Sequence, residues 1–200
     1  MRLGRLEVGG GFLLLTAWLN YLDNQGVVPL ILLACLLHEL GHLAVLRGLG
    51  VPVGRIRLTV VGAELEVLAP LSYGGEMAAA LAGPAVNLVL ALAFCRPEWG
   101  RVFAGINLVL ALFNLLPVGG LDGGRALRAA LSLALGPERS DGIGGRLDAL
   151  LTGGLLALGL FFLGMGGKAT LWITACWLFS SIWREKRGKR ACHPVRKRVK

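Results

Sequence analysis

The residues best suited to chemistry form the run His38-Glu39-Leu40-Gly41-His42, inside an apolar stretch of a 200-residue chain. On a helix, side chains four positions apart lie one turn apart on the same face, so both histidines can reach one metal ion. Glu39 follows the first histidine directly, where it can accept a proton from a water molecule at that ion. This spacing is typical of zinc sites that hydrolyse peptides.

The alternative is a chance polar cluster at a helix end, with its side chains reaching toward the membrane interface. Ionisable groups are costly in lipid, by a few kcal/mol or more near the centre of a span. Three of them within five residues therefore need compensation. A bound cation in a wet, protein-lined site provides it, so we expect a metal ion here.

A zinc site of this kind needs a third protein ligand, with one position left for water. His193 lies in a basic tail, which leaves the acids near apolar segments. These acids are Asp23, Glu64, Glu66, Glu76, Glu98, Asp122 and Asp148. Asp122 differs from the others because it follows a helix break at Pro117 and has four glycines around it. Such a break at membrane depth is tolerated only around a cavity, but an N-cap role for Asp122 on the helix Gly123–Leu135 stays open.

The elements that must position these residues are apolar helices. The chain is 55% hydrophobic and only 16% charged, whereas soluble domains are about 25% charged. Since a span needs roughly 20 mostly apolar residues, we predict an all-α polytopic membrane protein with about six transmembrane helices. The expected spans are Gly11–Leu22, Val27–Leu46, Met77–Phe94, Val102–Val118, Leu147–Met165 and Ala169–Trp183. They form one domain over residues 1–183, with a Gly-rich connection at Asp141–Gly145 and a basic tail at residues 184–200.

The basic residues predict the orientation of these spans. With a cytoplasmic N-terminus, all of the 21 lysines and arginines except Arg96, Arg101 and Lys168 fall in the inside segments. Such an asymmetry indicates a multi-pass protein of the cell membrane with both termini in the cytoplasm. The tail from Arg184 has no interleaved aromatic residues, so we read it as an anchor to anionic lipid rather than a nucleic-acid site.

Between the second and third spans, polar and apolar residues alternate with a period of two, which predicts strands. Val61–Ala63 is the expected turn of a small β-hairpin. Two interpretations stay open. The hairpin either covers the membrane domain as an amphipathic surface element, or offers an edge strand to an unwound substrate. In the second case Leu58 and Leu65 are the candidate substrate-binding residues.

Three motifs together resemble the site-2 protease family of intramembrane metalloproteases. HELGH lies in an early span, and NLLPVGGLDGGR ends a later one. Asn114, Pro117, Asp122 and Gly123 match the family pattern N-x-x-P-x-x-x-x-D-G. The segment Gly83–Asn87, GPAVN, is similar to the family's Gly-x-x-x-Asn element. The resemblance covers a three-span catalytic core at about residues 27–130.

This resemblance implies one zinc ion per chain, held by His38, His42 and Asp122, with Glu39 as the general base. It also makes Asn114 a candidate donor to the developing oxyanion. Asn87 is then a candidate for positioning the substrate. Both asparagines can instead be hydrogen-bonding residues between helices.

The short connections are most similar to the stage IV sporulation protein FB group, which processes a membrane-associated pro-sigma factor. That group carries a C-terminal CBS domain, whereas only 17 residues follow Trp183 here. The expected partners are a membrane-anchored protein substrate cut near the cytoplasmic side, a membrane inhibitor or regulator protein, and the lipid bilayer. No nucleic-acid partner is expected. The rival functions are a divalent-cation transporter and a catalytically inactive escort of membrane proteins.

Overall fold

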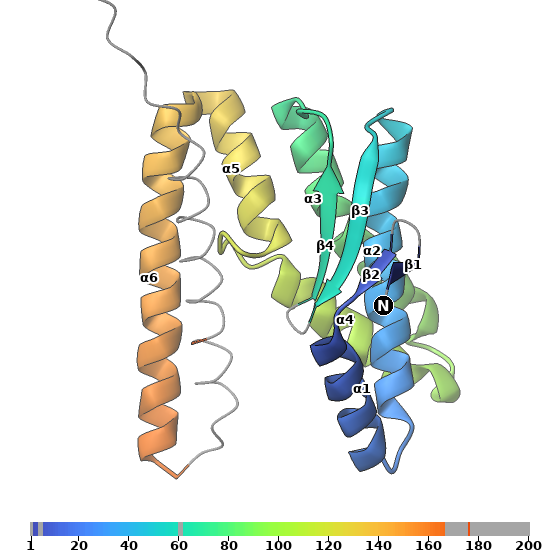
Figure 1. The fold of residues 1–200 in the computed structure, drawn as a ribbon. Helices are drawn as coiled ribbons and strands as arrows, with labels where there is room; N and C mark the ends of the chain where they lie inside the picture. Colours follow the sequence, from blue (N-terminus) through green and yellow to red (C-terminus); the bar gives the residue numbers. More distant parts are fainter. Residues whose placement is uncertain (1, 4–5, 60–61, 167–175, 177–200) are drawn as a thin grey trace, which may run out of the picture. The chain divides into compact units, whose positions relative to one another are not determined.

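The computed structural model describes residues 2–3, 6–59, 62–166 and 176 (Figure 1). It divides into two compact units, Met1–Leu116 and Pro117–Lys200. The first unit contains a small sheet and the helices α1 to α4. The second contains α5 and α6.

The core of the first unit is a group of three helices. α2 (Val27–Gly48), α3 (Tyr73–Phe94) and α4 (Arg101–Asn114) pack against one another. The shorter α1 (Gly10–Leu22) contacts α2, and a 3-10 turn, η1 (Glu98–Gly100), leads into α4. Small side chains line the interior, and Ala34, Ala80 and Ala111 are fully buried. The helix backbones can therefore approach closely, as is common in membrane helices.

The ends of the two long helices are set by local signals. Asp23 accepts hydrogen bonds from the backbone N–H groups of Val28, at 2.7 Å, and Gln25, at 3.1 Å. The Val28 bond is the main cause that lowers the pKa of Asp23 below its ordinary value. At the other end of α2, Gly50 adopts a positive φ of 69°. The hydroxyl of Ser72 caps α3 by accepting from the Gly75 N–H at 3.1 Å.

Four strands form one sheet in the order β1-β2-β3-β4. They are β1 (Arg2–Leu3), β2 (Leu6–Val8), β3 (Val53–Thr59) and β4 (Gly62–Val67). β3 and β4 form the predicted hairpin, and β3 contacts α2 (Figure 1). Gly62 and Ala63, which were expected in the turn, belong to β4. The N-terminal residues add two strands that were not predicted, with β2 parallel to β3. Glu7 of β2 faces two basic side chains of β3, and its carboxylate lies 3.1 Å from Arg57 and 3.6 Å from Arg55.

The second unit begins with a turn and continues as two helices, α5 (Asp122–Leu135) and α6 (Pro137–Gly164). Gly136 joins them with a φ of 84°, a conformation that favours glycine, and proline occupies the first position of α6. The expected loop at Asp141–Gly145 is wrong, because these residues lie within α6. Packing of α6 against α5 stabilises a helix that its glycines disfavour locally.

Three helices of the described residues are long and apolar enough to cross a membrane: α2, α3 and residues Pro137–Phe161 of α6. The predicted fold, mainly helical with a small sheet, is confirmed by the helices and the four-stranded sheet described above. α4 is shorter than the span expected at Val102–Val118, since it ends at Asn114, three residues before Pro117. The span expected at Ala169–Trp183 and the basic tail lie outside the described residues, apart from Cys176.

Candidate metal centre

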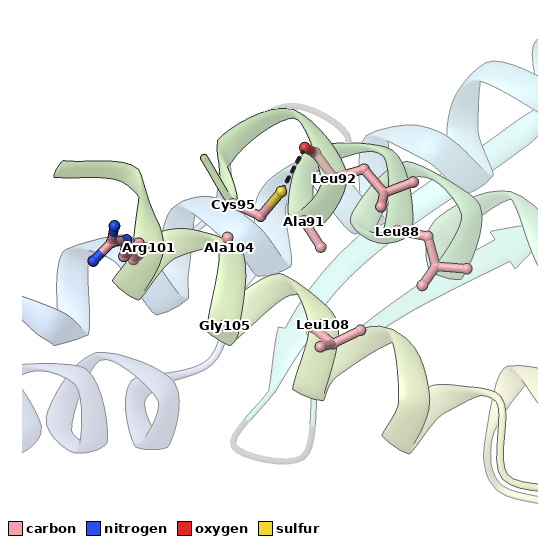
Figure 2. Close-up of a pocket in the computed structure, with 8 residues that line it drawn as sticks. All are labelled: Leu88, Ala91, Leu92, Cys95, Arg101, Ala104, Gly105 and Leu108. Carbon is pink, nitrogen blue, oxygen red and sulfur yellow. Dashed lines mark hydrogen bonds between the residues drawn. The ribbon is translucent and has the colours of Figure 1, made fainter. Parts of the chain in front are cut away.

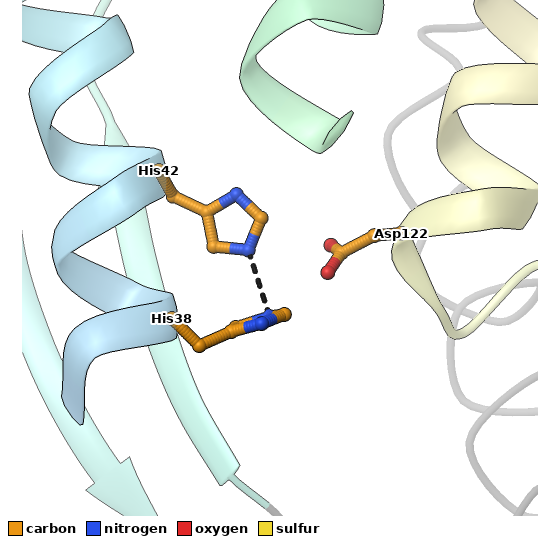
Figure 3. A group of neighbouring side chains, drawn as sticks. All are labelled: His38, His42 and Asp122. Atoms are coloured by element: carbon orange, nitrogen blue, oxygen red, sulfur yellow. Dashed lines mark hydrogen bonds between the residues drawn. The ribbon is translucent and has the colours of Figure 1, made fainter. Parts of the chain in front are cut away.

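His38 and His42 lie one turn apart on the same face of α2, and both are buried (Figure 3). Their Nε2 atoms are 3.1 Å apart, and the two rings meet edge to face. Two nitrogens bound tetrahedrally to zinc at about 2.0–2.1 Å would lie about 3.3–3.4 Å from each other. The pair therefore has nearly the separation that a shared zinc ion requires.

A hydrogen bond at the second ring nitrogen, Nδ1, fixes the orientation of His42. Its Nδ1 donates a hydrogen bond to the backbone carbonyl oxygen of Ala79, on α3, at 2.7 Å. Because a carbonyl can only accept, the proton is on Nδ1 and the lone pair is on Nε2. Metal-binding histidines in general have this outer hydrogen bond, which sets both the tautomer and the ring orientation.

The space in front of the two rings exists because residue 83 is a glycine. A Cβ atom at Gly83 would lie 2.7 Å from Nε2 of His38 and closer still to Nε2 of His42. α3 passes so near because Gly41 of α2 also lacks a side chain, and a Cβ there would be 2.9 Å from the carbonyl oxygen of Ala82. Gly83 thus leaves the space beside the two Nε2 atoms free of a side chain, and Gly41 lets α3 pass close to them.

The other predicted residues of the first unit lie on three different helices. Glu39 follows His38 on α2 and is half-buried. Asn87, on α3 one turn beyond Gly83, is fully buried, and among the described residues neither its amide nitrogen nor its oxygen has a hydrogen-bond partner. Asn114 ends α4, and its side-chain amide donates to the carbonyl oxygen of Leu110 at 3.0 Å.

Asp122 belongs to the second unit, where it is the first residue of α5 (Figure 3). Leu121 occupies the N-cap position, so Asp122 lies in the first turn rather than at the cap. Its side chain is buried, and one carboxylate oxygen is 3.7 Å from the guanidinium group of Arg125. The residue thus lies at the positive end of the dipole of α5.

The two candidate substrate residues of the sheet differ in their position. Leu58 lies on β3, between Val8 of β2 and Ala63 of β4. β3 is therefore an inner strand, because the N-terminal strands pair with it, and it offers no free edge at Leu58. Leu65 lies on β4, which is an outer strand of the sheet.

An apolar pocket of about 380 Å³ lies between α3 and α4, and it includes none of the predicted site residues (Figure 2). Arg101 is the one charged residue in its lining, and it pairs with Glu98 at 3.7 Å. Within the pocket the Cys95 thiol donates to the carbonyl oxygen of Leu92. This lining offers no metal-ligand cluster.

Two features of the site were missed by reasoning from the sequence. Gly83 was recognised only as part of a motif, although its closeness to the histidine pair is what leaves room there. Asp148 was considered as a ligand, whereas it forms a buried ion pair with Arg128 inside the second unit. The sequence signal for this pair is that Arg128 and Asp148 are the last charged residues of α5 and α6, where each helix becomes apolar.

The sequence is similar to those of known zinc metalloproteases. The sequence model of peptidase family M50 matches residues 100–147. Rip3 of Mycobacterium tuberculosis is 34% identical over 206 residues, which cover 88% of this chain and 49% of Rip3. A zinc metalloprotease of Methanocaldococcus jannaschii is 30% identical over 142 residues, or 66% of this chain and 42% of that protein. The chain thus spans about half the length of the curated relatives that it matches.

The fold is similar to that of a solved site-2 protease from Methanocaldococcus jannaschii. The TM-score is 0.70 at 24% sequence identity, and the match covers 100% of this chain and 98% of that one. The long apolar helices are those of a membrane protein, and the histidine pair is a candidate metal site on one of them. Together with the sequence matches, they show that the chain belongs to the site-2 protease family, peptidase family M50.

Proposed function

We propose that this protein is an intramembrane zinc metalloprotease that cleaves a membrane-anchored protein near the cytoplasmic side. The observation that carries the proposal is the pair of Nε2 atoms 3.1 Å apart in front of Gly83, with His42 oriented by the Ala79 carbonyl. This arrangement fits zinc better than it fits a structural histidine pair, because a structural pair needs no opening beside its nitrogens.

His38 and His42 supply two ligands, and Asp122 is the proposed third. Each of the three offers one ligand atom of a type that zinc binds. Support for Asp122 comes from the N-x-x-P-x-x-x-x-D-G pattern and from its burial at the start of α5. Three protein ligands leave a fourth position for water, which is the arrangement of a catalytic zinc site.

When bound, zinc lowers the pKa of a coordinated water toward about 7 and polarises the substrate carbonyl. Glu39 is the general base that accepts the proton from the attacking water and then passes it to the leaving amine. Asn114 donates a hydrogen bond to the carbonyl oxygen as charge develops on it. Its amide has a second N–H besides the one that bonds to Leu110, so both bonds can exist together.

The substrate helix must unwind before hydrolysis, because its carbonyls are hydrogen-bonded within the helix. We infer that the unwound segment pairs with β4, the outer strand that carries Leu65, by strand addition. Asn87 then contacts the substrate, and its buried amide without a partner among the described residues supports that role. Leu58 contributes by holding β4 in register.

The proposed cellular setting follows from the charge asymmetry of the sequence. The protein is a multi-pass protein of the cell membrane with both termini in the cytoplasm, and the metal centre lies near the cytoplasmic face. A membrane-associated pro-sigma factor is the proposed substrate, by similarity to the sporulation group. A membrane protein that inhibits or regulates the protease is the proposed partner.

The test uses the full chain, purified and reconstituted in liposomes with a membrane-anchored candidate substrate. The protein should bind one zinc ion per chain and convert the substrate to a shorter product. The variant Glu39→Gln should keep zinc but lose cleavage by at least a factor of about 10². Asp122→Ala should lose zinc affinity as well as cleavage.

Three outcomes would reject this function. Cleavage by Glu39→Gln at the wild-type level contradicts the mechanism. Zinc flux across the liposome without peptide cleavage would indicate a cation transporter. Substrate binding without cleavage, equal in the parent and in Glu39→Gln, would indicate an inactive escort.

A further inference from the structure

We propose that Asp148 of α6 is a positioning residue, whose carboxylate fixes the turn that leads into Asp122. The inference rests on the proposed role of Asp122 as a zinc ligand. It concerns only the second unit, where the turn, α5 and α6 meet through one buried carboxylate.

The two oxygens of Asp148 contact two different elements. Oδ1 accepts a hydrogen bond of 2.7 Å from the backbone N–H of Gly119, in the turn, and Oδ2 forms an ion pair with the guanidinium group of Arg128, on α5. Asp148 itself is only 1% exposed. A hydrogen bond from a backbone N–H to an ionised carboxylate is among the strong ones, and burial keeps water from competing for it.

The turn has little freedom once Asp148 holds it. The Leu121 N–H donates to the carbonyl oxygen of Val118 at 2.9 Å, which closes the turn just before Asp122. A Cβ at Gly119 would be 2.8 Å from Oδ2 of Asp148, and a Cβ at Gly124 would be 2.7 Å from the Gly119 nitrogen. The glycines of this segment therefore let the turn lie directly against both the ion pair and α5.

Arg128 is itself held in place by α6. The hydroxyl of Ser140 donates to the Arg128 carbonyl oxygen at 2.9 Å. A Cβ at Gly144 would lie 3.1 Å from Nε of Arg128, so the guanidinium stem runs close along α6. The ion pair thus joins both helices to the turn, and the position of Asp122, three residues after Gly119, depends on it.

Two double variants separate the effect of the buried charges from the effect of the hydrogen bond between Gly119 and residue 148. In Arg128→Met/Asp148→Asn, the asparagine oxygen can still accept from the Gly119 N–H. In Arg128→Met/Asp148→Leu, no acceptor remains. Both variants remove both buried charges together, so neither leaves an unpaired charge in the interior.

The measurement is the zinc dissociation constant of the full chain in nanodiscs, by competition with a chromophoric chelator. The asparagine variant should bind zinc within about threefold of the parent, whereas the leucine variant should bind about 10- to 100-fold more weakly. The control is Thr152→Val, one turn along α6, whose hydroxyl has no hydrogen-bond partner among the described residues. It should leave zinc affinity unchanged. Equal affinities of the two double variants would overturn the proposal.

Hydrogen exchange of the wild-type chain gives a second test that does not depend on the folding of any variant. The Gly119 amide should exchange as slowly as the interior amides of α5. Rapid exchange would contradict the clamp, by which we mean the hydrogen bond from the Gly119 N–H to the Asp148 carboxylate. The variant Asp122→Ala serves as the reference. If it binds zinc as tightly as the parent, the proposed ligand set fails, whereas slow exchange at Gly119 would still support the clamp itself.

Discussion

The substitution Gly83→Ala tests the metal centre with a single methyl group. Its Cβ would lie 2.7 Å from Nε2 of His38, whereas ordinary van der Waals contact begins at 3.4 Å. The imidazole ring and the new Cβ must therefore move apart by about 0.7 Å. Metal sites tolerate errors in ligand distance of only about 0.2 Å. Forcing each imidazole about 30° off its rotamer costs about 0.5–1.5 kcal/mol. For two rings, zinc affinity should fall by about 1–3 kcal/mol, or roughly 5- to 150-fold.

The matched control is Gly105→Ala, on α4, where an added Cβ meets no other atom within 4 Å. It should bind zinc like the parent and gain a little helix stability. The assay is the zinc dissociation constant of each purified variant, with cleavage rates measured at saturating zinc. Zinc binding by Gly83→Ala equal to that of the parent would refute the claim that the opening at residue 83 holds the ion.

Three further predictions concern the parts that support the site. Asp23→Ala should lower the melting temperature at neutral pH, because the carboxylate caps α2 through Val28. The pKa of Asp23 is depressed in the folded chain, so this stabilisation is present above the ordinary carboxyl pKa and is lost as the pH falls through the pKa of the folded chain. The melting temperatures of parent and variant should therefore converge in acid. A difference that stays constant with pH would contradict the capping role of Asp23. Gly41→Ala should destabilise the zinc-free protein by about 1–3 kcal/mol in denaturant titrations, since its Cβ would meet the Ala82 backbone at 2.9 Å; unchanged stability would show that the helices do not pack this closely. Leu65→Pro should impair substrate cleavage while zinc affinity stays the same, and full activity would argue against strand addition at β4.

Local features of the sequence predicted the helix that carries the histidine pair and the strands of the hairpin. The spacing of His38 and His42 needs only a helix to bring both rings to one face, and an apolar run of this length is helical in a membrane. The strands of the hairpin followed from an alternation within one short segment. Each of these predictions depends on residues that are close in the chain, where geometry is fixed by the period of the element.

The errors arose where distant segments meet. The start of the chain pairs with β3 about 50 residues later, so only β4 of the predicted hairpin is an outer strand. The residues Asp141–Gly145 read as a loop because of their glycines, but packing against α5 keeps them helical. Local propensity is weak, and tertiary contacts override it when an element can bury a face.

The sequence by itself determined the candidate metal ligands His38 and His42, their spacing and the apolar helix that carries them. Tertiary structure alone decided that a glycine of α3 lies against the histidine pair, that a carbonyl of the same helix orients His42, and that Asp148 holds the turn before Asp122. Motif spacing is a property of one helix, whereas an opening or a clamp exists only between elements whose approach is set by packing.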